Sequence, residues 1–132
     1  MAIQYSVAVN NARLDAVEST AGTTAVLKIF SGAQPASCAS ADPSGTLATI
    51  TLPSDWMNAA SAASKTKNGT WSGTASGSGT AASFRIYASD GTTCHIQGSC
   101  GLGTGDLQLD NTNIATNQTV TVNTFTLNAA NT

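Results

Sequence analysis

The chain carries little charge. Five of its 132 residues are Lys or Arg and seven are Asp or Glu, so that 9% are charged, against about 25% in a typical soluble domain. The five basic residues are scattered and do not form the clustered positive surface that nucleic acids select. We therefore expect no nucleic-acid partner.

Histidine and cysteine are also scarce. The sequence has one histidine, His95, and three cysteines, Cys38, Cys94 and Cys100, with no C-x₂-C spacing for zinc. An odd number of cysteines without a secretory signal argues against a disulfide framework. A bridge between Cys94 and Cys100 across a hairpin stays open, but free, partly buried thiols are the default expectation. We expect no cofactor.

Long apolar runs are missing as well. No window approaches the roughly 18 apolar residues that a membrane span requires. The first residues lack the basic start and apolar stretch of a secretory signal. We expect a protein that is made in the cytosol and has no membrane partner.

Small residues fill the sequence instead, with 22 Ala, 20 Thr and 15 Ser. A chain of 132 residues fits one domain and can bury a core without metals or disulfides. A weakly charged, Thr-rich surface is typical of copies packed side by side, and also of a secreted β domain. Composition alone does not choose between them.

A helix is predicted over residues 2–20. Its apolar stripe consists of Ile3, Val7, Leu14 and Val17. Two asparagines interrupt the stripe, and Gly22 marks the stop. We treat residues 1–22 as an N-terminal helical segment.

After Gly22 the apolar period changes to two, which indicates strands. They are expected at 25–30, 47–52, around 69–71, and at 80–89, 92–97, 107–109 and 119–127. Asp90-Gly91 predicts a hairpin turn, and a slip in the alternation predicts a β-bulge near Asn123-Thr124. The fold class is mainly β, with residues 23–132 forming a single antiparallel β-sandwich or jelly-roll-like domain of seven or eight short strands.

Two segments lack a clear strand pattern. Residues 31–45 contain two prolines and are expected to form a long loop. Residues 54–64 fit either a short helix capped by Ser54 or a loop that places Trp56 in the core. With Met57 and Trp71, Trp56 could also form a sugar-binding surface, although core packing is the simpler interpretation.

No catalytic constellation stands out. Cys94 and His95 are adjacent on a predicted strand, so their side chains should point to opposite faces and not meet. The remaining acidic candidates for paired catalysis lie in predicted turns: Asp55, Asp90, Asp106 and Asp110. A calcium site drawn from Asp106, Asp110 and the nearby asparagines is less favoured than ordinary turn chemistry. We expect a protein that is not an enzyme.

Four stretches carry a resemblance to known proteins. They are Ala2–Glu18, Leu52–Met57, Phe84–Gly98 and Phe125–Leu127. Together they resemble small β-rich virion structural proteins of tailed bacteriophages and prophages, usually without an assigned function. The resemblance implies a virion protein assembled in the bacterial host cytoplasm, most simply a capsid decoration or cement protein that bridges capsomers. A tail or neck structural protein and a carbohydrate-binding tail-tip module are the alternatives.

The helix stripe is narrow, so residues 2–20 are expected to contact something outside the β domain. The expected interface residues are Ile3, Tyr5, Val7, Leu14, Val17, Trp56 and Met57. The expected partner is the major capsid protein or another virion protein, with the chain itself forming a homo-oligomer, taken as a trimer.

Overall fold

One helix precedes a series of short strands. The computed structural model describes residues 3–129. Helix α1 (Val7–Ala21) is followed by β1 (Val26–Phe30), β2 (Thr46–Thr51), β3 (Ser64–Thr66), β4 (Ser72–Thr74), β5 (Gly79–Thr80), β6 (Ser83–Tyr87), β7 (Cys94–Gly101), β8 (Leu107–Leu109), β9 (Asn113–Ile114) and β10 (Thr119–Asn128). The mainly β fold class with an N-terminal helix is therefore confirmed.

Helix α1 begins later than predicted. The Oγ of Ser6 accepts the backbone N–H of Val9 at 3.1 Å, and this cap fixes the first helical residue at Val7. The helix ends at Gly22 as expected: φ there is 86°, and its N–H donates to the carbonyl of Glu18 at 2.9 Å. Ala2, the first residue of the predicted helix, lies outside the described residues.

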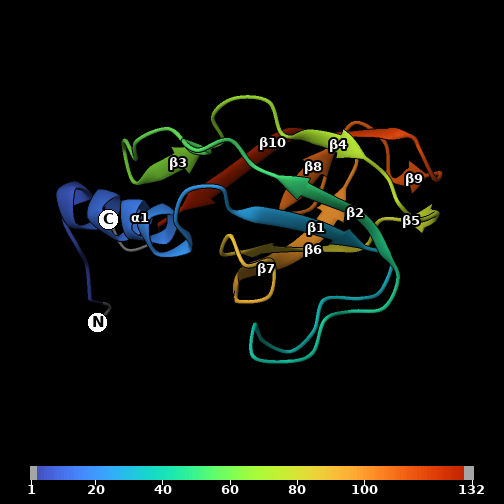
Figure 1. Ribbon diagram of the computed structural model, residues 1–132. Coiled ribbons are helices and arrows are strands. Elements are labelled where there is room, and N and C mark those ends of the chain that lie inside the picture. The colour runs from blue at the N-terminus through green and yellow to red at the C-terminus, as the bar shows by residue number, and fades with distance from the viewer. Residues whose placement is uncertain (1–2, 130–132) are drawn as a thin grey trace.

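Most strands belong to one curled sheet (Figure 1). Its order is β2-β1-β6-β7-β8-β10-β3, with β4 also pairing with β10, while β5 and β9 pair with each other. The sheet bends until Ala48 of β2 pairs with Ala75, just after β4, and the N–H of Ser76 donates to the carbonyl of Leu47 at 2.8 Å. Because hydrogen bonds join these strands into one continuous sheet, a sandwich of two separate sheets is not confirmed.

Several predicted pairings are present. The hairpin of β6 and β7 turns at Asp90-Gly91, and the register of β10 against β8 shifts between Val122 and Thr124, where the bulge was predicted. The all-antiparallel prediction is wrong for β7 and β8, which pair in parallel.

The parallel pair is made possible by the glycine-rich connection between these two strands. Gly103 and Gly105 have φ values of 70° and 83°, which side-chain-bearing residues rarely adopt. The chain also passes very close to itself, because a Cβ on Gly101 would lie 2.2 Å from the carbonyl oxygen of Thr104. The sequence G-L-G-T-G therefore allows the chain to form a complete, tight loop between β7 and β8.

Aromatic side chains fill the inside of the curled sheet. Trp56 packs on Trp71 with ring centroids 5.9 Å apart, and Phe125 contacts both Trp71 and Phe84 at 5.5 Å. Residues 54–64 form no helix, and their loop places Trp56 in this core, one of the two predicted possibilities.

The long loop 31–45 covers the other face of β6. It lies as an extended cyan segment at the bottom of Figure 1. All five residues of β6 are buried, because the core takes one face and this loop takes the other. Ser83 shows the contact: its hydroxyl donates to the carbonyl of Gly32 at 2.7 Å.

Candidate functional site

The segment before α1 and the first turn of the helix expose four apolar side chains. Ile3 is 73% exposed, and Tyr5, Val7 and Val9 are exposed to between 39% and 48%. We call these four residues the N-terminal apolar surface. Three of them were predicted interface residues. Val9 was missed because it lies off the predicted helix stripe.

The N-terminal apolar surface is held in a defined place. The Ser6 cap orients the backbone between Tyr5 and Val7. The guanidinium of Arg13, about two turns further along the helix, lies 4.9 Å from the centroid of the Tyr5 ring, a favourable cation–π contact. Figure 1 places this end of α1 at one extremity of the molecule, beside β3 and the end of β10.

A buried lysine anchors α1 to the sheet. Lys65 in β3 is 2% exposed, and its ammonium group lies 2.7 Å from Asp15 Oδ1 and 3.0 Å from Glu18 Oε1. It also donates to the carbonyl of Asn58 at 2.9 Å. All three ammonium protons therefore have acceptors, which makes the burial of this charge tolerable.

The same contacts shift two pKa values. Burial lowers the pKa of Lys65, but the hydrogen bonds to Asp15 and Glu18 outweigh it, and the net shift is upward. The hydrogen bond from Lys65, with one from the Ala60 N–H, lowers the pKa of Asp15. No local pattern indicates the lysine as a partner of the helix, because it lies 50 positions from Asp15.

The predicted interface is wrong at three residues. Trp56 is fully buried, Met57 is 1% exposed and Leu14 is 7% exposed, so none can meet a partner. They are buried because the 54–64 loop closes over the core beneath α1, where the N–H of Met57 donates to Glu18 Oε2 at 2.9 Å.

Core packing, the simpler interpretation of the aromatic residues, is confirmed, and the alternative of a sugar-binding surface is wrong. Trp56, Trp71 and Tyr87 are all fully buried. The indole N–H of Trp56 donates to the carbonyl of Gly22 at 3.0 Å, and that of Trp71 to Asn68 at 3.1 Å. These rings stabilise the fold and present no face to a sugar.

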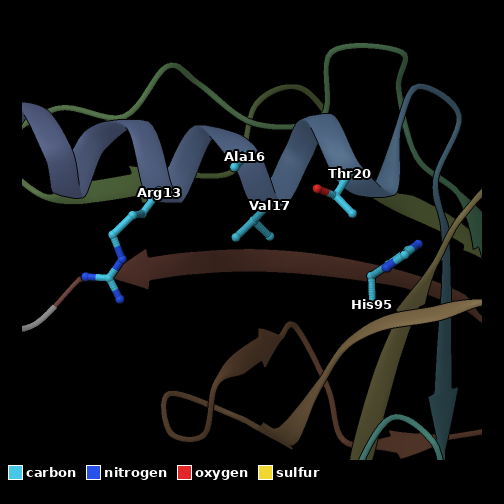
Figure 2. A pocket seen from close by; sticks show the side chains of 5 residues that line it. All are labelled: Arg13, Ala16, Val17, Thr20 and His95. Carbon is cyan, nitrogen blue, oxygen red and sulfur yellow. The ribbon is translucent and has the colours of Figure 1, made fainter.

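The remaining predicted interface residue, Val17, lines a shallow hollow beneath α1 (Figure 2). The hollow measures about 260 Å³ and is lined by Arg13, Ala16, Val17, Thr20 and His95. Figure 2 shows Arg13 and His95 at its opposite ends. His95 therefore faces the helix, whereas Cys94, the preceding residue, packs beside Val26, Phe30 and Tyr87.

A polar cluster lies under loop 31–45. The Arg85 guanidinium is 2% exposed and donates to the carbonyls of Ser37 and Ser40 and to Asp42 Oδ1, each at 3.0 Å. Burial, followed by the hydrogen bond to Asp42, raises the pKa of Tyr87. The cluster fixes the loop by satisfying groups of the chain itself.

Within residues 3–129, no group of three or more His, Cys, Asp or Glu side chains is placed to hold a metal ion, and no helix is both long and apolar enough to cross a membrane.

The predicted turn carboxylates form local hydrogen bonds. Asp106 Oδ2 accepts the Ser99 N–H at 3.0 Å, and Asp110 Oδ1 accepts the Thr121 N–H at 3.3 Å.

Comparison with known proteins gives no relative. No protein family, no curated protein and no solved structure matches this chain.

Proposed function

We propose that the protein is a non-enzymatic structural component of the virion of a tailed bacteriophage, most simply a capsid decoration or cement protein. It binds the major capsid protein or another virion protein and bridges neighbouring capsomers. The observation that carries the proposal is the N-terminal apolar surface, in which four of seven consecutive residues expose large apolar side chains. The resemblance of the four sequence stretches supplies the setting.

An exposed apolar segment favours contact with a partner. Covering it releases roughly 25 cal/mol for each Å² of apolar surface removed from water. The chain exposes 6422 Å² in total, and a standard interface takes about 800 Å² from each partner. The surface can therefore form the centre of such an interface while most of the molecule stays free for neighbouring copies, taken as a trimer.

A modest binding energy for each contact is sufficient for stable attachment when many copies bind the same shell. A protein that binds at symmetric positions of a shell engages several neighbours at once, and linked contacts strengthen one another without any new chemistry. We interpret the curled sheet in this setting as a jelly-roll-like β-sandwich, a rigid body that carries the apolar surface at one end. Assembly takes place in the bacterial host cytoplasm.

The first test counts copies in particles. Virions of the phage or prophage that encodes the chain are purified, and the chain is quantified against the major capsid protein by mass spectrometry. A copy number that matches the shell is expected. A number matching a single ring would assign the protein to the neck or tail, and its absence from particles would refute a virion role.

The second test addresses the surface itself. We expect Ile3→Asp and Val7→Asp to reduce the amount of protein bound to purified shells at least about tenfold, because a charge placed in an apolar contact must be desolvated. Leu102→Asp is the matched control, since Leu102 is 61% exposed but lies in the β7–β8 connection. Equal loss in all three variants, or no loss in the first two, would contradict the assigned surface.

A further inference from the structure

Two thiols from distant parts of the chain meet beneath loop 31–45. Cys38 lies in the loop and Cys94 opens β7, 56 positions further along, and their Sγ atoms are 2.8 Å apart. Both cysteines are free and half-buried. A disulfide bond has an S–S length of about 2.05 Å, so the sulfur atoms need to approach by less than an ångström.

The structure holds the two thiols in this arrangement. Arg85 binds the carbonyls of Ser37 and Ser40, on both sides of Cys38. The side-chain amide of Gln97, further along β7, donates to the carbonyl of Pro35 at 2.8 Å. The backbone on each side of the pair is therefore fixed by bonds that do not involve sulfur.

The third cysteine is placed differently. Cys100 lies in the same strand as Cys94, six residues further along, which at about 3.3 Å per residue separates the two by about 20 Å. This distance rules out the Cys94–Cys100 bridge that the sequence left open, because bridged cysteines need Cα atoms within about 7 Å.

We propose that Cys38 and Cys94 form a redox-responsive disulfide that fastens loop 31–45 to β7. The oxidant is a low-molecular-weight disulfide such as glutathione disulfide. The Cys38 thiolate attacks it, which forms a mixed disulfide and releases one thiolate. The Cys94 thiolate then attacks the Cys38 sulfur and releases the second. Both protein thiols lose a proton, and the two electrons reside on two molecules of reduced glutathione.

The order of attack follows from the surroundings of Cys94. Burial, with the neighbouring Cys38, raises the pKa of Cys94 to about 12, so its thiolate is scarce while Cys38 is reduced. The second step is then intramolecular, between sulfur atoms already in contact.

The test uses the whole chain, purified with reductant and then exposed to glutathione disulfide without air. We expect a product with no disulfide between chains that has lost two hydrogen atoms by intact mass and has one titratable thiol left after denaturation. Cys100→Ser is the matched control and should form the same bridge with no thiol left. Cys38→Ser and Cys94→Ser should only take up glutathione.

Three results would overturn the proposal: three persisting thiols in the wild-type chain, an internal bridge in Cys38→Ser or Cys94→Ser, or a product that is mainly a covalent dimer. A second measurement tests the fastening of the loop. Oxidation should raise the Tm of the wild type and of Cys100→Ser by about 5 °C or more, and leave that of Cys94→Ser unchanged. A bridge that forms without raising the Tm would refute the fastening.

Discussion

Lys65 shows how a single residue ties the helix to the sheet. Its ammonium group is buried, whereas the carboxylates that bind it, Asp15 and Glu18, keep 47% and 19% of their side-chain surface in solvent. The two sides of the ion pair are therefore unequal. Losing the carboxylates leaves a charge inside the protein, while losing the lysine leaves charges that water can still reach.

This inequality predicts an asymmetric mutational response. Lys65→Met keeps the buried stem and should lower the urea midpoint only slightly, because Asp15 and Glu18, which lose their partner, keep contact with solvent. The double variant Asp15→Asn with Glu18→Gln should lower the urea midpoint of unfolding several times more. Equal midpoints for the two variants would show that the lysine charge is not buried in solution.

The same pair predicts how stability depends on pH. The folded-state pKa of Asp15 lies below its unfolded value of 3.8, so the contribution of this group is complete above about pH 4 and is lost as pH falls through the folded value. Lys65→Met should flatten the decline of Tm between about pH 4 and pH 2.

Asp90 supplies the internal comparison for that measurement. Its pKa is also lowered, by the hydroxyl and N–H of Thr93, and Lys65 is not among the groups that shift it. Asp90→Asn should therefore remove a separate part of the acid decline, and the two effects should add. A decline that Lys65→Met leaves unchanged would contradict the role given to Asp15.

At the scale of elements, loop 31–45 behaves as part of the folded structure because Arg85 binds it at three points. Arg85→Lys keeps the charge but loses the planar fork that reaches the three acceptors. Elastase should cut the loop about tenfold faster, since each charged hydrogen bond contributes roughly 1.5–3 kcal/mol.

The measurement is a time course of cleavage with the cut sites located by mass spectrometry. Arg13→Lys is the control, because Arg13 lies on α1 and makes no bond to the loop. Cleavage at unchanged speed in Arg85→Lys would mean that the loop is held by other contacts.

Local patterns predicted the strands well and their burial poorly. The hairpin at Asp90-Gly91 and the bulge near Asn123 follow from neighbouring residues alone. The burial of Arg85 and of Lys65 depends on partners more than 40 residues away. The alternation of apolar and polar residues along one strand therefore does not predict it. The parallel pairing of β7 and β8 was missed because its cause, a full loop of glycines, resembles an ordinary flexible turn.

At the scale of the whole molecule, the candidate surface was predicted only in part. Ile3, Tyr5 and Val7 are exposed as expected, because they precede or begin a helix whose other side is used. Trp56 and Met57 were wrongly assigned to the interface, because the sequence pattern of an apolar residue in a loop is the same whether the side chain packs in the core or faces a partner. Burial separates the two, and it is a property of the completed fold.

Helix α1 contributes both to the stability of the fold and to the proposed interface. Its inner side supplies Asp15, Glu18 and Leu14 to the fold, and its N-terminal end carries the apolar surface. Removal of residues 2–20 would therefore remove the partners of Lys65 together with the surface, and folding and binding could not be told apart. Single substitutions at Ile3 and Val7 separate them.

The closing contact between Ala48 and Ala75 has a consequence for crowding. A free outer strand offers a row of unpaired amides and carbonyls on which another chain can extend the sheet. Here residues 75–77 occupy the outer side of β2 at Leu47 and Ala48. A protein with so few charges cannot rely on electrostatic repulsion to keep copies separate at high concentration. The curled sheet provides a different protection, because it uses its own backbone to block the growth of fibrous stacks.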